Sequence, residues 1–230
     1  MKMRLATVLL LLLCLVGCKA MRFQYPNSAC QVRRFPAAKQ VAIAVDEITD
    51  LRDDKSSTEG WSLLCYLPLV PCVPYHNYDL QGYNADVGSF AFNVKRELRE
   101  ALARHVNESG IGVACQDSSK ACDYRIVARL HKIGIDGYRT FYCLGLSPGC
   151  FAAILGAPFN YAKSSLEIEF ELLDGKGKVV LSKRYGASRD YVVGEYVNWN
   201  CLKYVGMNLC EIMNQFCQDA SVVMRKEQGQ

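Results

Sequence analysis

Two neighbouring segments in the second half of the chain alternate between apolar and polar residues. In residues 165–174, SLEIEFELLD, Leu166, Ile168 and Phe170 alternate with glutamates. This segment runs into the turn sequence DGKG, after which residues 178–185 form a second apolar segment. A period of two places alternate side chains on opposite faces of a strand. The sequence therefore predicts a β-hairpin in an antiparallel sheet with one buried and one exposed face.

Three further segments have the composition of strands: residues 40–45, 111–115 and 123–135. The first is short, apolar and β-branched, and the last alternates between apolar and polar residues. The first two of these strands, with a helix between them, could form a parallel crossover unit. The other strands are expected to be antiparallel.

Two segments carry apolar residues at steps of three or four, the spacing of an amphipathic helix. The first runs from residue 87 to residue 106, with Asn84 or Asp86 as a candidate N-cap and Gly110 as a stop. The second covers residues 202–223. We therefore predict an α+β fold, with a mostly antiparallel sheet of about five strands and two helices on one face.

Two apolar segments, residues 61–80 and 140–161, are interrupted by proline or glycine and each contains a pair of cysteines. Prolines at 68, 71 and 74 exclude a helix and a central strand from the first segment. Both are predicted to be loops that either pack together as an extra core layer or bind a protein partner or lipid. Their aromatic residues are the partner-binding candidates: Trp61, Tyr66, Tyr75, Tyr78, Phe141, Tyr142, Phe151, Phe159 and Tyr161.

The first residues of the chain have the order of an export signal. Lys2 and Arg4 precede an apolar run, residues 5–16, which is shorter than the roughly 20 residues that span a bilayer. The run ends in the tetrad Leu15-Val16-Gly17-Cys18. This tetrad resembles the bacterial lipobox, in which the cysteine is acylated and the chain is cut just before it. The resemblance implies fatty acids, palmitate among them, on Cys18.

The lipobox resemblance implies three regions: a signal peptide (1–17), a lipidated tether (18–38) and a single α+β domain (39–226). Lys19 is not the aspartate associated with retention in the inner membrane, so the resemblance favours the outer membrane, facing the periplasm. The alternative is an ordinary secretory signal, cut after Ala20.

The chain has twelve cysteines, or ten without Cys14 and Cys18. An even number fits disulfides in an oxidising compartment, although a zinc site and free thiols are alternatives. Three pairs are seven residues apart and flank segments that contain Pro, Gly or Ser, and these are the predicted bridges: Cys65–Cys72, Cys115–Cys122 and Cys143–Cys150.

Cys210 and Cys217 have the same spacing but lie in a predicted helix. Seven helical residues rise about 10.5 Å, whereas bridged Cα atoms lie within about 7 Å. These two cysteines are therefore expected not to bridge each other. Each could instead reach a partner such as Cys30 or Cys201.

The charge balance excludes the dense basic face of a nucleic-acid-binding protein. The chain has 27 Lys and Arg, of which Lys2 and Arg4 precede Cys18, against 23 Asp and Glu. It contains no P-loop, dinucleotide-binding, zinc-protease or serine-hydrolase motif. The glutamates at 167, 169 and 171 share the outer face of a predicted strand and are interpreted as solvated.

Among the three histidines only His76, near Asp79 in the first loop, is a candidate site residue. Cys65 or Cys72 could act with it as a nucleophile, but a bridge between those cysteines explains them better. We therefore expect no enzymatic activity, no metal and no cofactor.

The order of segments carries a second resemblance. VAIAV running into DEITDLRDD, then a capped helix, TFYCLGL and LEIEFELLDGKGKVVLSKRY resemble a group of bacterial envelope lipoproteins. That α+β type occurs in the TolB amino-terminal domain and in auxiliary lipoproteins of envelope transport and assembly. The resemblance covers most of residues 40–220, although members usually have far fewer cysteines. It implies a non-catalytic accessory or binding role.

Taken with the lipobox, this resemblance predicts a membrane-anchored envelope lipoprotein that binds a protein partner in transport or surface assembly. Two alternatives are a carrier of lipid or of a small apolar ligand, and a disulfide-stabilised hydrolase or redox protein.

Overall fold

The computed structural model describes the following residues: 23, 25, 30–35, 41–53, 57–58, 73–78, 80, 93–115, 122–139, 155, 157, 160–193 and 202–227. Within this part of the chain it has two helices and one mixed sheet of eight strands. The predicted α+β class is confirmed, as are the mostly antiparallel sheet and the two helices. The sheet has more than the five strands expected because three short ones, Thr49–Asp50, Ser57–Thr58 and Val73–Asn77, were not predicted.

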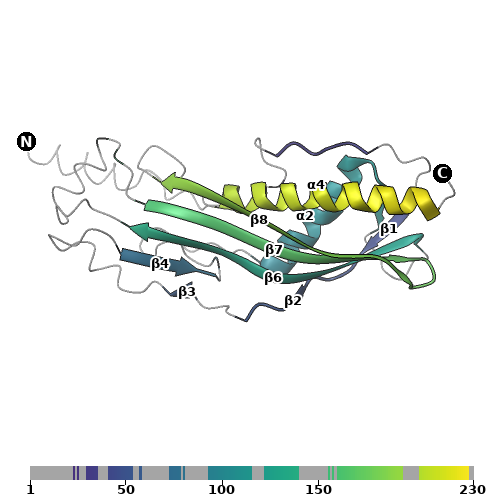
Figure 1. Ribbon diagram of the computed structural model, residues 1–230, viewed down its shortest axis with the longest axis horizontal. Helices are drawn as coiled ribbons and strands as arrows, with labels where there is room; N and C mark the ends of the chain where they lie inside the picture. The colour runs from purple at the N-terminus through teal and green to yellow at the C-terminus, as the bar shows by residue number, and fades with distance from the viewer. Residues whose placement is uncertain are drawn as a thin grey trace, which may run out of the picture.

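Three long antiparallel strands form the body of the sheet: β6 (Tyr124–Arg139), β7 (Asn160–Asp174) and β8 (Val179–Val193) (Figure 1). The predicted hairpin is confirmed as β7 and β8. Its turn is closed by Asp174, whose carboxylate accepts a hydrogen bond from the Lys178 amide at 2.9 Å. Gly177 supplies the positive φ of 80° that the turn requires.

The short strands extend the sheet along the other edge of β6. They are β1 (Ala42–Val45), β2 (Thr49–Asp50), β3 (Ser57–Thr58), β4 (Val73–Asn77) and β5 (Val113–Cys115). Three of them pair with successive parts of β6. β1 and β2 run parallel to it, and β4 runs antiparallel. β5 pairs in parallel with β1. The predicted parallel crossover unit is thus β1, the first helix and β5.

β4 corrects the prediction that residues 61–80 form a loop without a strand. It pairs with β6 over five residues, and Pro74 lies opposite Tyr138. On its other side β4 pairs only at His76 and Asn77, with β3. Among the described strands Pro74 therefore has a neighbour on one side only, which is the edge position that proline tolerates.

The two helices are α2 (Val94–Ser109) and α4 (Leu202–Glu227). Asn93, and not Asn84 or Asp86, caps α2, because its side chain accepts a hydrogen bond from the Arg96 amide at 3.1 Å. Gly110 ends the helix as predicted, with a φ of 74°.

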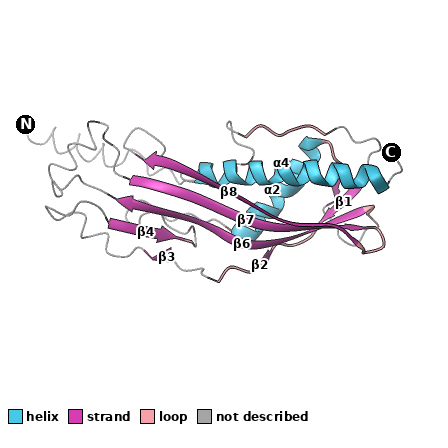
Figure 2. Cartoon of the chain, viewed as in Figure 1, coloured by secondary structure: helices cyan, strands magenta, loops and turns pink. Residues whose placement is uncertain are grey.

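Both helices pack against the same face of the sheet and share one apolar core with it (Figure 2). Phe216 of α4 lies at the centre of this core. Its ring centroid is 4.6 Å from that of Phe170 on β7 and 6.2 Å from that of Tyr185 on β8. These long-range contacts hold α4 along β7 and β8.

The segment before β1 packs against the helices on the side away from the sheet (Figure 1, purple). We call its described residues, 23, 25 and 30–35, the N-terminal strap. A disulfide joins Cys30 to Cys210 of α4. Beside it, the Asn214 side chain accepts a hydrogen bond from the Arg33 amide and donates one to the Gln31 carbonyl, both at 2.9 Å.

The strap is also fixed to α2. The Phe35 amide donates to the Ser109 carbonyl at 2.7 Å, and the Arg104 guanidinium donates to the Tyr25 carbonyl. The Tyr25 hydroxyl lies 2.5 Å from Nδ1 of His105. Burial lowers the pKa of His105 to about 4, so its ring is neutral at pH 7 and can accept from the tyrosine. Part of the segment predicted to be a tether thus belongs to the packed domain.

Candidate functional site

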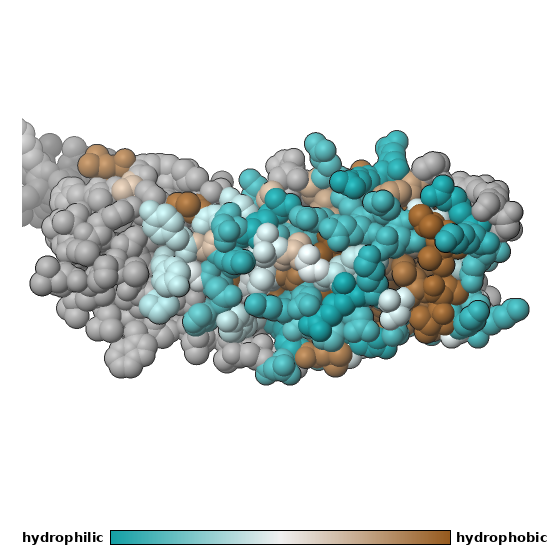
Figure 3. Space-filling model, viewed as in Figure 1, coloured by the Kyte–Doolittle hydropathy of each residue, from teal (hydrophilic) through white to brown (hydrophobic). Residues whose placement is uncertain are grey.

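The face of the sheet opposite the helices, which we call the outer face, is mostly polar in the described residues (Figure 3). The predicted exposed positions of β7 are on this face: Glu167, Glu169 and Glu171 are half-buried, whereas Leu166, Ile168 and Phe170 are buried. The alternation in the sequence therefore identified the two faces correctly.

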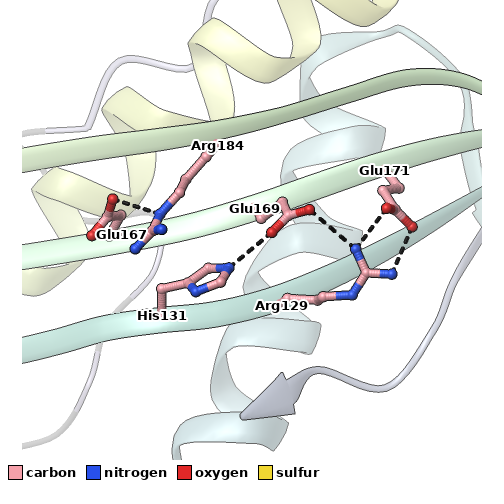
Figure 4. A network of polar contacts seen from close by, with 6 residues as sticks. All are labelled: Arg129, His131, Glu167, Glu169, Glu171 and Arg184. Atoms are coloured by element: carbon pink, nitrogen blue, oxygen red, sulfur yellow. Dashed lines mark hydrogen bonds and ion pairs between the residues drawn. The ribbon is translucent and has the colours of Figure 1, made fainter. Parts of the chain in front are cut away.

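Basic side chains of neighbouring strands pair with these glutamates (Figure 4). The guanidinium of Arg129 on β6 lies 2.6 Å from Glu171 and 3.2 Å from Glu169. His131, at the bulge of β6, approaches Glu169 through Nε2 at 2.9 Å. Arg184 of β8 lies 2.6 Å from Glu167.

This arrangement favours a structural role for the glutamates over acid–base catalysis. The hydrogen bond from His131 lowers the pKa of Glu169, with a further contribution from Arg129. A general acid needs the opposite shift, a pKa raised towards neutrality. We interpret the network as cross-strand pairs that stabilise the sheet while keeping the outer face hydrophilic.

The four strands β4, β6, β7 and β8 come into line at one end, which we call the sheet end. Val73, Arg139, Asn160 and Val193 form a single row of register partners across them. In Figure 2 this end extends past the start of α4. Both predicted aromatic loops join the sheet here, the first at β4 and the second between β6 and β7. The topology therefore brings the attachment points of the two loops together.

The next row inward carries exposed apolar and aromatic side chains on the outer face. It consists of Pro74, Tyr138, Tyr161 and Val192, which are register partners across the four strands. Tyr138 is 56% exposed, Tyr161 43% and Val192 37%. We call these four residues the exposed row. Aromatic side chains gathered on a surface are typical of protein interfaces.

A polar cluster adjoins the exposed row. Asp136 accepts a hydrogen bond from the Tyr78 hydroxyl at 2.8 Å and lies 2.8 Å from Nδ1 of His76. The guanidinium of Arg52 donates to the Tyr78 carbonyl at 2.6 Å and is paired with Asp50 at 2.9 Å. The predicted neighbour of His76, Asp79, lies outside the described residues.

The cluster has only part of what a hydrolase needs. A carboxylate orients the His76 ring, as in a general-base pair. Within the described residues, the hydroxyl that contacts this ring belongs to Tyr78, which also hydrogen-bonds to Asp136. The geometry therefore supports a polar contact surface better than nucleophilic catalysis.

The cysteines divide into three groups. The prediction that Cys210 pairs outside its own helix is confirmed by the Cys30–Cys210 disulfide. Cys217 is a buried free thiol, and burial raises its pKa to about 12. Four predicted bridge residues and three others lie outside the described residues: Cys65, Cys72, Cys143, Cys150, Cys14, Cys18 and Cys201.

Cys115 and Cys122 are free thiols in this structure and not the predicted bridge. The two thiols are nevertheless joined by a hydrogen bond, which raises the pKa of Cys122. Cys115 ends β5 and Cys122 lies two residues before the start of β6, so the strands that flank β1 bring the two thiols together.

The structure places only some of the predicted partner-binding residues. Tyr75 is on β4, Tyr78 follows it, and Tyr161 is in the exposed row. The others lie outside the described residues: Trp61, Tyr66, Phe141, Tyr142, Phe151 and Phe159. Sequence reasoning missed Tyr138 and Val192, which extending the alternation of β6 and β8 by a few residues would have identified.

In the described part of the chain, neither helix is long and apolar enough to cross a membrane. None of the histidines, cysteines, aspartates and glutamates in this part gather in a group of three or more that could hold a metal ion.

No protein-family model matches the chain, and no curated protein matches it in sequence. Solved structures resemble it at low sequence identity. A Xanthomonas campestris protein of the family designated DUF330 is 10% identical with a TM-score of 0.49, over 87% of this chain and 97% of its own.

A hypothetical protein from Chlamydia trachomatis is 10% identical with a TM-score of 0.44, over 80% of this chain and 96% of its own. A candidate lipoprotein from Caulobacter crescentus is 14% identical with a TM-score of 0.33, over 56% of this chain and 80% of its own.

Proposed function

We propose that this chain is a lipid-anchored binding protein of the bacterial cell envelope. In this proposal Cys18 is acylated and holds the domain on the outer membrane, facing the periplasm. The domain is a non-catalytic accessory of transport or surface assembly, and it binds a protein partner at the sheet end.

The observation that carries the proposal is the disulfide between the strap and α4, downstream of a lipobox-like tetrad. Disulfides such as Cys30–Cys210 persist in oxidising compartments, the bacterial periplasm among them. Cys18 lies twelve residues before Cys30 in the sequence. A lipobox-like tetrad followed within twelve residues by a cysteine that forms a disulfide supports a location outside the cytoplasm.

Replacing Cys18 by serine tests the anchor. In cells given a fatty-acid analogue, the wild type is expected to be labelled and to enter the detergent phase after phase separation. C18S should lose the label completely, because serine offers no thiol for acylation. One acyl chain binds a bilayer only marginally and two or more bind stably, so the variant should also leave the detergent phase.

Cys14→Ser is the matched control, since Cys14 lies within the apolar run that the lipobox resemblance assigns to the signal peptide. It should be labelled like the wild type. A wild-type protein recovered unlabelled from the aqueous phase would refute the anchor.

The sheet end supports the partner-binding part of the proposal. It combines the exposed row with the polar cluster of His76, Tyr78 and Asp136. An apolar centre with polar groups at its rim is the usual composition of a protein interface. The two aromatic loops predicted from the sequence join the sheet at this same end.

A photo-reactive amino acid at Tyr138 or Tyr161 tests this surface in cells. Because both side chains are exposed and adjacent in register, each is expected to give the same discrete protein adduct. Val179, 46% exposed at the other end of β8, is the control and should not give that adduct. Equal adducts from all three positions, or adducts with lipid alone, would contradict the proposed interface.

A further inference from the structure

A groove lies between α2 and the carboxyl ends of β1 and β5. It has a volume of about 580 Å³, and Val45 and Cys115, the last residues of those two strands, form part of its wall. Three arginines of α2, Arg96, Arg99 and Arg104, line it together with a single carboxylate, that of Glu100. The formal charge of the lining is therefore positive.

The charges of two of these arginines are not neutralised by the carboxylates of the described chain. Arg99 donates through Nε to the Val45 carbonyl at 3.1 Å, and Arg104 donates to the Tyr25 carbonyl. Both partners are uncharged, and each guanidinium has further N–H donors. Arg96 differs, because it lies 3.1 Å from Glu97 and 3.9 Å from Glu100.

The strap connects this groove to the start of the chain. Arg104 touches the backbone of Tyr25, whose ring stacks with that of Phe23 at a centroid distance of 6.4 Å. Cys18 precedes Phe23 by five residues and Tyr25 by seven. An extended chain covers at most roughly 3.6 Å per residue, so Cys18 lies within about 18 Å of Phe23 and about 25 Å of Tyr25.

We propose that Arg99 and Arg104 bind the phosphate of anionic lipid headgroups in the membrane that carries the protein. The inference rests on the proposed acylation of Cys18, which confines the strap to the membrane surface. The short connection from Cys18 then brings the open side of the groove to the headgroup layer. Arginine suits this ligand because its planar fork of donors matches phosphate oxygens.

The proposal also gives the domain an orientation. The strap and α2 would face the bilayer, while the outer face and the exposed row, on the other side of the sheet, would face away from it. The partner-binding surface would then be presented to the periplasm.

Chemical modification of arginine tests the proposal on the mature lipoprotein. The protein is reconstituted into vesicles of phosphatidylcholine alone, or of phosphatidylcholine with phosphatidylglycerol, and treated with phenylglyoxal. Mass spectrometry then gives the modification rate of each arginine. A basic residue near an anionic surface gains roughly a fivefold preference for it, so Arg99 and Arg104 should react about fivefold more slowly on the anionic vesicles. About 1 M salt, where the Debye length is about 3 Å, should abolish the protection.

Arg125 and Arg184 on the outer face, 48% and 50% exposed in their side chains, are the internal controls and should react equally on both vesicles. In the variant R99Q, Arg104 should lose most of its protection. Equal rates at Arg99 and Arg104 on both vesicles would overturn the proposal. So would equal protection by inorganic phosphate in detergent micelles, which would indicate a site for a free anion.

Failure of the anchor is recognised separately. An acylated protein floats with vesicles of either composition, whereas an unacylated one is lost from vesicles of phosphatidylcholine alone. Flotation in both cases without protection of Arg99 and Arg104 would refute the headgroup site and leave the anchor intact.

Discussion

Replacing Cys30 and Cys210 by serine is expected to lower the free energy of unfolding by about 5 kcal/mol. The bond joins residues 180 apart in the sequence, and on the chain-entropy model a loop of that length restricts the unfolded state by about this amount. The variant should also loosen the part of the strap beside the bond, where Gln31 and Arg33 contact Asn214. Denaturant unfolding of the purified domain measures the change.

Cys115→Ser is the control, since it removes a half-buried thiol that forms no disulfide in the structure. Its free energy of unfolding should change by less than about 0.5 kcal/mol. Reducing agent should bring the wild type to the stability of C30S/C210S. A loss of less than about 1 kcal/mol in that variant would mean that the strap contributes little to the folded state.

Replacing Phe216 by alanine is expected to cost about 3–5 kcal/mol, the range for removing a buried aromatic side chain. Phe216 is fully buried, and its ring contacts those of Phe170 and Tyr185. Removing the ring would leave a cavity between α4 and the strands β7 and β8. These are the two strands with which α4 makes most of its contacts. Loss of the aromatic contacts should also change the near-ultraviolet circular dichroism.

Val222→Ala is the matched control on the same helix, because Val222 is 41% exposed. Its cost should stay within about 0.5 kcal/mol. If F216A and V222A unfold at the same denaturant concentration, α4 is not held by the aromatic cluster.

The parts of the fold that sequence reasoning predicted are those with a strong local period. The alternation of Leu166, Ile168 and Phe170 predicted β7 and the face it buries. The apolar steps of Leu98, Leu102 and Val106 predicted α2, whose core positions these are. In both cases the pattern is set by contacts with a single continuous core.

The same reasoning missed the residues of the long strands at the sheet end, which are the last residues of β6 and β8 and the first of β7, for a physical reason. At this end the inward positions are small: Gly137 on β6, and Ala162 and Ser164 on β7. Ser164 is buried but polar, and it accepts hydrogen bonds from Asn208 of α4 at its hydroxyl and its carbonyl. Small and polar inward residues weaken the apolar alternation, so the predicted strands stop short of the sheet end and the exposed row is not recognised.

The packing of the strap against the helices could not be predicted from a local sequence pattern. Tyr25 and His105 are 80 residues apart in the sequence, and Arg33 and Asn214 are 181 apart. No period in the strap's own sequence encodes such contacts. Helix geometry could exclude a bridge between Cys210 and Cys217, but it left Cys30 and Cys201 open as partners of Cys210. The position of the strap across the helices determines that the partner is Cys30.

Cys30 precedes all the described strands in the chain, and Cys210 follows all of them. If the chain is exported from its amino terminus, as proposed, Cys30 reaches the oxidising enzymes well before Cys210 does. Until α4 has been translocated, Cys30 would remain a thiol or form a temporary disulfide with another cysteine. Under the proposed export, the native bridge can close only after α4 has been translocated, so formation of the correct pair should depend on enzymes that reshuffle mispaired cysteines.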